Sequence, residues 1–66
     1  MAVHVVVSLD GGLLNALAIC STTQRAEVMA REWAGNLPYD PVHRRWEDEN
    51  TEVFVISDLE VDGKSH

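Results

Sequence analysis

The residues best suited to chemistry or contact form a short aromatic and basic cluster late in the chain. It consists of Tyr39, His43, Arg44, Arg45 and Trp46. Arginine and aromatic side chains dominate the binding energy of protein–protein interfaces. Three interpretations are open. Trp46 can fill the domain's own core while the arginines pair with neighbouring acids, the cluster can bind a partner or a second copy, or it can bind a ligand or nucleic acid.

The other reactive side chains follow no catalytic or metal-binding pattern. Cys20 has no cation close to it in the sequence, so we expect a buried, inert thiol. His4 lies inside an apolar run, and we expect its hydrogen bonds to be satisfied. The three histidines, His4, His43 and His66, lack the close spacing to each other or to Cys20 that zinc sites show. We therefore expect no catalytic residue, no metal and no cofactor.

The length of the chain favours self-association. At 66 residues it is close to the lower size limit for a domain that folds alone. Domains of this size supplement a small core with disulfides, a metal or oligomerisation. A single cysteine excludes an intrachain disulfide. We therefore expect a homodimer or a higher oligomer, which can also bind another protein.

The net charge of −6 is concentrated in the last third of the chain. Lys64 alone opposes the acidic residues there, which are Glu47, Asp48, Glu49, Glu52, Asp58, Glu60 and Asp62. This charge disfavours direct nucleic-acid binding, because affinity for phosphates comes from lysine and arginine. Two interpretations remain: a solvated acidic edge, or a mimic of nucleic-acid charge that inhibits a nucleic-acid-processing protein.

The sequence predicts neither a membrane span nor a signal peptide. No run of about 18 apolar residues is present. Residues 1–20 lack a basic start and are interrupted by Asp10-Gly11-Gly12. With one cysteine and no export signal, we expect a cytoplasmic protein.

Two apolar runs around Asp10-Gly11-Gly12 predict a β-hairpin over residues 3–20, because both dipeptides suit a tight turn with positive φ. The choice between them, and so the register, stays open. Either register predicts one face on which a helix can lie: Val3, Val5, Val7, Leu9, Leu14, Ala16, Ala18 and Cys20. The second face carries Val6, Leu17 and Ile19, and we expect a second copy to cover it or to pair with an edge strand.

A helix is predicted over about residues 22–34. Ser21 and Gln24 have the spacing of a capping box, although Thr22 or Thr23 can also cap. Gly35 or Asn36 should end the helix. Its expected apolar stripe consists of Ala26, Met29, Ala30 and Trp33. We expect Trp33 to be a buried core anchor.

Residues 36–50 form a long connection that contains two prolines. A slack linker of this length would be rich in glycine and serine, so we predict an ordered contact element, in which Asp40-Pro41 begins either a short turn or a helical turn around residues 42–46. Trp46 should be at least half buried, and Arg44 and Arg45 should lie near carboxylates. A last strand should follow over residues 52–61, with Val53, Val55, Ser57, Leu59 and Val61 on one side and Phe54 and Ile56 on the other.

Together these elements predict an α+β domain over residues 1–62, with a frayed tail at 63–66. Its ββαβ order gives a three-stranded antiparallel sheet, order 2-1-3, with one helix packed on one face.

The stretch Ala18-Ile-Cys-Ser-Thr-Thr-Gln-Arg-Ala-Glu-Val-Met-Ala places a Ser/Thr pair between a second strand and a helix bearing Ala-Glu. It resembles small uncharacterised bacterial and mobile-element ββαβ proteins over residues 3–34. The resemblance implies a fold and no shared activity. We therefore predict a non-catalytic protein–protein interaction module that acts as a homo-oligomer, with the acidic inhibitor as the alternative. The expected contact residues are Val6, Leu17, Ile19, Tyr39, Arg44, Arg45 and Trp46.

Overall fold

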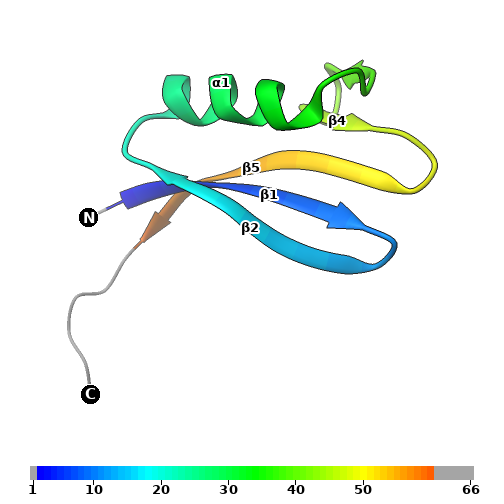
Figure 1. Ribbon diagram of the computed structural model, residues 1–66. Coiled ribbons are helices and arrows are strands. Elements are labelled where there is room, and N and C mark those ends of the chain that lie inside the picture. Colours follow the sequence, from blue (N-terminus) through cyan, green and yellow to red (C-terminus); the bar gives the residue numbers. More distant parts are fainter. Residues whose placement is uncertain (1, 61–66) are drawn as a thin grey trace.

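The structure, a computed structural model, describes residues 2–60, which form one α-helix and five β-strands (Figure 1). These are β1 (Ala2–Asp10), β2 (Leu13–Cys20), α1 (Thr23–Ala34), β3 (Tyr39–Asp40), β4 (Arg45–Glu47) and β5 (Thr51–Glu60). The expected position of Val61 and the expected frayed tail at 63–66 lie outside the described residues. Within the described residues, α1 is neither long nor apolar enough to span a membrane.

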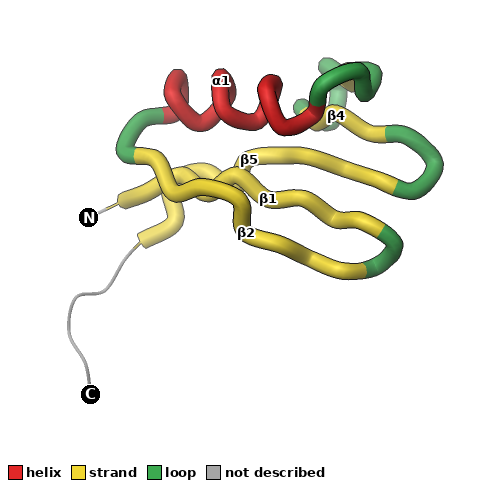
Figure 2. The backbone as a smooth tube through the Cα atoms, viewed as in Figure 1, coloured by secondary structure: helices red, strands yellow, loops and turns green. Residues whose placement is uncertain are grey.

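The strands form one antiparallel sheet in the order β2-β1-β5-β4-β3 (Figure 2). The predicted α+β class, the helix on one face and the order of the three long strands are confirmed. The prediction of three strands is wrong, because residues 36–50 contribute a small hairpin, β3–β4, that extends the sheet beyond β5. Asp40-Pro41 begins the turn of this hairpin, as the sequence indicates.

The loop between β1 and β2 is Gly11-Gly12. Both glycines have positive φ, 58° and 87°, and Asp10 pairs with Leu13 across the loop. A two-residue turn of this kind needs positive φ at both central positions, which glycine adopts at no steric cost. The structure thereby selects one of the two registers that the sequence left open, with Val7 opposite Ala16.

A β-bulge in β2 changes which residues share a face. Val7 pairs with Ala16 but Val6 pairs with Ala18, so Leu17 is an extra residue without a partner on β1. One inserted residue moves everything beyond it to the other side of the sheet. Ala18 and Cys20 therefore join the face of Val6, opposite to the predicted arrangement.

A second bulge interrupts β5. Val5 pairs with Ile56 but Val3 pairs with Leu59, so two residues of β5 oppose His4. Asp58, in the bulge, has a φ of 56°, and its N–H donates to Nδ1 of His4 at 3.4 Å. The buried ring of His4 thus satisfies a backbone donor that the ladder leaves free.

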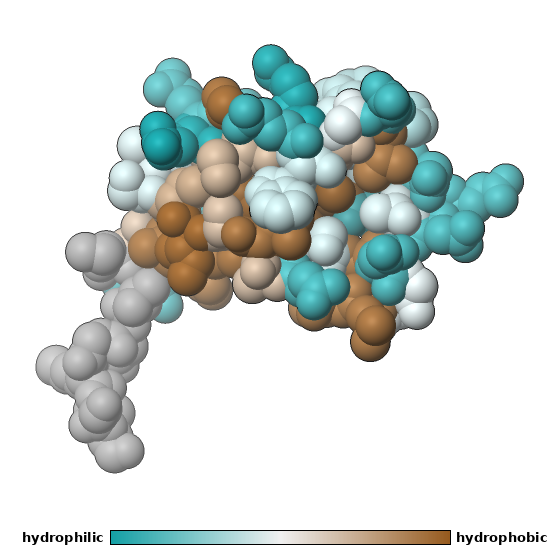
Figure 3. All heavy atoms as spheres, in the orientation of Figure 1, coloured by the Kyte–Doolittle hydropathy of each residue, from teal (hydrophilic) through white to brown (hydrophobic). Residues whose placement is uncertain are grey.

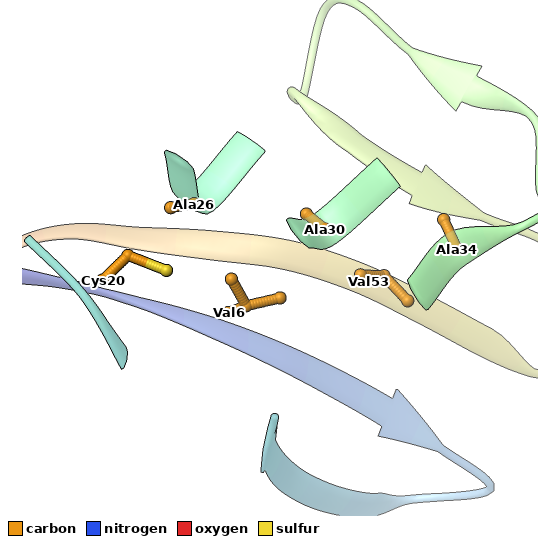
Figure 4. Close-up of a cluster of buried hydrophobic side chains, with 6 residues drawn as sticks. All are labelled: Val6, Cys20, Ala26, Ala30, Ala34 and Val53. Carbon is orange, nitrogen blue, oxygen red and sulfur yellow. The ribbon is translucent and has the colours of Figure 1, made fainter. Parts of the chain in front are cut away.

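The helix α1 packs on the face of Val6, whereas the prediction placed it on the face of Val5 and Val7. Figure 4 shows the core cluster between helix and sheet, with Ala26, Ala30 and Ala34 from α1 and Val6, Cys20 and Val53 from the strands. Three alanines spaced four residues apart give α1 a narrow seam, which lets the helix lie close to the sheet. The buried position expected for Cys20 is confirmed, at 7% exposure.

Trp33 is not a core anchor, because 56% of its surface is exposed. Successive helical residues are about 100° apart, so Trp33 lies beside the alanine seam. The ends of α1, in contrast, agree with those predicted from the sequence. Oγ1 of Thr22 accepts the N–H of Arg25 at 3.2 Å, and Gly35, with a φ of 60°, ends the helix.

Candidate functional site

The sheet face opposite α1 is apolar, and no helix or loop of residues 2–60 packs on it (Figure 1). We call it the open face. The pairing register places on it Val5, Val7, Leu9, Leu14, Ile19, Phe54 and Ile56. Val5 and Val7, on the central strand β1, are buried among their neighbours at 9% and 3% exposure. Ile19 is 71% exposed, Leu14 64% and Ile56 40%. In Figure 3 hydrophobic side chains gather over the strands, whereas mostly hydrophilic side chains lie along α1. Large apolar side chains are therefore offered to solvent on one side of the sheet.

Of the three contact residues predicted in the first hairpin, only Ile19 lies on the open face. Val6 is fully buried under α1, and Leu17 packs against the core cluster. Both differences have one cause: α1 covers the face of Val6, to which the bulge at Leu17 adds the small residues Ala18 and Cys20. The expectation that Val6 and Leu17 contact a partner is therefore corrected.

The cluster between Tyr39 and Trp46 is built into the sheet as the β3–β4 hairpin. Tyr39 and Trp46 are cross-strand partners, and their ring centroids lie 4.7 Å apart at an angle of 51°. Trp46 lies on the helix side, opposite Val53, and packs against the core cluster. Its predicted burial is confirmed, and the predicted ordered element takes the form of paired strands.

Asp40 organises the turn of this hairpin. Its Oδ1 accepts the N–H groups of Val42 at 3.0 Å and His43 at 3.4 Å, and its Oδ2 lies 2.7 Å from Nδ1 of His43. The hydrogen bond from His43 is the largest cause that holds the pKa of Asp40 below its ordinary value of 3.8. The turn is therefore fixed by an ionised carboxylate.

The two arginines have different surroundings. Arg45 lies on the open face beside Phe54, with Nε 2.6 Å from Oε2 of Glu47 and Nη1 3.2 Å from Oε1 of Glu52. The buried Nε makes an ion pair with Glu47 without the alignment of a hydrogen bond. Arg44 has an exposed side chain, a φ of 54° and no ion pair within the described residues. The predicted carboxylate partners are thus confirmed for Arg45 alone.

A cavity of about 600 Å³ lies on the helix side, between α1 and the outer part of the sheet. We call it the arginine cavity. Its lining consists of Glu27 and Arg31 from α1, Tyr39, Arg44 and Trp46 from the hairpin segment, and Val55 and Ser57 from β5.

Of this lining, the sequence indicated the aromatic and basic residues Tyr39, Arg44 and Trp46 as contact residues. It did not indicate the residues that α1 and β5 contribute. The spacing of Glu27 and Arg31 puts them on one side of a helix. Which strand that side meets depends on the face that α1 covers, and the bulges decide that face.

The acidic residues of the last third do not form one surface. Glu47 and Glu52 flank Arg45 on the open face, and Asp48 accepts the N–H groups of Asn50 and Thr51 at 2.8 Å in the β4–β5 turn. Asp58 and Glu60 lie at the opposite end of β5. Within residues 2–60, no group of three histidine, cysteine or acidic side chains is arranged to hold a metal ion.

No family model, curated protein or solved structure matches this chain.

Proposed function

We propose that this domain is a non-catalytic protein–protein interaction module that acts as a homo-oligomer, with the open face as its contact surface. The observation that carries the proposal is the exposure of Leu14, Ile19 and Ile56 on a sheet face that no described element covers. Contiguous apolar patches of this kind mark interaction sites on soluble domains.

The core of the monomer is small, so burial of the open face would add to the stability of the folded chain. Three of the six residues in the core cluster are alanines, and Val6 is the largest side chain that is fully buried. An alanine buries little apolar area, whereas burial of a leucine or isoleucine stabilises by about 1.5–3 kcal/mol. Association through the open face would therefore bury the larger apolar side chains that the monomer leaves in water.

The border of the open face also has the polarity of an interface. Arg45, Glu47 and Glu52 lie on the same side of the sheet as Phe54 and form a paired charged group beside the apolar residues. An apolar centre with a polar rim is the usual anatomy of a protein interface. Two copies related by a two-fold axis would bring the same patch of each sheet together.

Sedimentation equilibrium over a micromolar concentration series tests the proposal. The expected mass is at least twice the 7.3 kDa of one chain. Ile56→Glu should give monomers, because it places a charge in the apolar centre. Since β5 lies between β1 and β4, this variant tests the face and not the exposed edge at β2.

Val42→Glu is the matched control. Val42 is 81% exposed in the hairpin turn, away from the open face, so this variant should keep the oligomeric mass. A wild-type mass of 7.3 kDa at high micromolar concentration would overturn the proposal. An unchanged mass for Ile56→Glu would show that an edge strand, and not the open face, makes the contact.

A further inference from the structure

We propose that the arginine cavity binds a small ligand in which a phosphate group is joined to a planar aromatic ring, the chemistry of a mononucleotide. The cavity volume of about 600 Å³ is in the range that holds small ligands, about 300–1,000 Å³. Three separate parts of the chain supply its walls: α1, the β3–β4 hairpin and β5. This site lies on the helix side of the sheet and is independent of the open face.

Two guanidinium groups give the cavity its anion preference. Neither Arg31 nor Arg44 has a carboxylate within 4.0 Å among residues 2–60, in contrast to Arg45, which has two. A guanidinium presents parallel N–H donors that match carboxylate and phosphate oxygens. One such fork satisfies the two oxygens of a carboxylate, whereas a phosphate has enough oxygens for two forks. A pair of free arginines on one cavity therefore favours phosphate.

The aromatic pair provides a surface for a planar ring. Tyr39 and Trp46 both line the cavity, with ring centroids 4.7 Å apart, and Trp46 is held in place by the core cluster. A ring held by packing loses little freedom when a ligand stacks on it, and bases stack on aromatic side chains without needing a particular sequence. The two arginines would thus bind the phosphate group of the ligand, and the two aromatic rings would stack on its planar ring.

The remaining polar residues restrict which kinds of ligand the cavity can bind. Glu27 and Ser57 line the same cavity, so a carboxylate is available to accept a hydrogen bond from a ring amino group or a sugar hydroxyl. Glu27 and the net charge of −6 also repel long polyanions. These charges favour a single nucleotide over an extended strand.

The backbone at Arg44 supports a role for its side chain. Of the described positions with positive φ, three are glycines and one is Asp58, a residue type that tolerates this region. Arg44, with a φ of 54°, is the exception, since a long side chain gains nothing from the turn itself. A non-glycine residue held in this conformation is a mark of functional sites.

Titration of the ¹⁵N-labelled full chain with adenosine monophosphate, adenosine and inorganic phosphate tests the site. We expect saturable amide shifts confined to residues 27–31, 39–46 and 55–57, and at least tenfold tighter binding of the nucleotide than of either fragment. A short single-stranded oligonucleotide distinguishes a free nucleotide from the terminal nucleotide of a strand as the ligand. Weaker binding of the oligonucleotide supports a free nucleotide, and tighter binding at the same residues would overturn the proposal that the cavity binds a free mononucleotide.

Three variants complete the test. Arg44→Gly and Arg31→Gln should each weaken nucleotide binding at least tenfold, and Arg44→Gly retains the fold because glycine suits the positive φ. Arg25→Gln is the matched control, since Arg25 lies on another side of α1, in a groove with Thr22 and Val28, and should bind as the wild type does. The absence of saturable shifts at millimolar nucleotide, or equal losses in Arg25→Gln and Arg31→Gln, would overturn the proposal.

Discussion

At the scale of single residues, Arg44 has a backbone conformation that is unfavourable for most residues other than glycine. Its φ of 54° is disfavoured for residues with a Cβ by about 1–2 kcal/mol. Glycine removes this strain but adds flexibility to the unfolded chain, which offsets about 0.5–1 kcal/mol. We therefore predict that Arg44→Gly stabilises the domain by about 0.5–1 kcal/mol, measured as a higher urea midpoint at fixed protein concentration.

Val42→Gly is the matched control for this prediction, because Val42 lies in the same turn without a positive φ. It should lower the urea midpoint, since glycine there adds only freedom to the unfolded chain. A lower midpoint for Arg44→Gly as well would show that the left-handed backbone at this residue is not strained.

Asp40 gives a second prediction at the residue scale, concerning pH. The hydrogen bond from His43 lowers the pKa of Asp40 below 3.8 in the folded chain. A depressed carboxyl pKa contributes stability that is present above the ordinary value and is lost as the pH falls through the folded value. We predict that His43→Ala raises the pKa of Asp40 toward 3.8, measured by NMR titration of the carboxyl carbon. The same titration curve in both proteins would remove His43 as the cause.

At the scale of elements, the sequence specified the three long strands and the helix but not their faces. Strict alternation assigns Ala18 and Leu59 to faces that the structure reverses. Single bulges at Leu17 and at Ser57–Asp58 cause both reversals, and no residue type at these positions marks an insertion. The β3–β4 hairpin was missed for another reason, because strands of two and three residues are too short to show a periodicity.

The helix α1 carries the prediction at this scale. Ala30 is fully buried in the core cluster, whereas Trp33 is 56% exposed beside it. We predict that Ala30→Leu destabilises by about 1–3 kcal/mol, because extra methylene groups have no space between helix and sheet. Trp33→Ala should destabilise by less than about 1 kcal/mol, as expected of a surface position. Urea unfolding of both variants checks the order, and a larger loss in Trp33→Ala would place the indole in the core.

At the scale of the whole molecule, the two candidate surfaces lie on opposite sides of one sheet. The open face consists of residues that alternate with those under α1, and the arginine cavity lies beside α1. The sequence identified Tyr39, Arg44 and Trp46 by residue type, but not Arg31, because only the packed fold brings α1 beside the hairpin. This separation means that a ligand in the cavity and a second copy on the open face do not compete for the same residues.

Self-association through the open face predicts that thermal stability depends on protein concentration. Binding of one native chain to another stabilises the folded state by mass action, and a tenfold rise in concentration adds about 1.4 kcal/mol per dimer, or about 0.7 kcal/mol per chain. In a domain of this size, 1 kcal/mol corresponds to about 4–8 °C, so the melting temperature should rise by about 3–6 °C for each tenfold increase. Ile56→Glu should melt at one temperature throughout the series, because a buried charge on the open face prevents the association. Scanning calorimetry over a hundredfold range of concentration measures both proteins. If the melting temperature of the wild type also stays constant, the open face remains exposed to water in a folded monomer. Folding of this small domain then does not depend on a second copy.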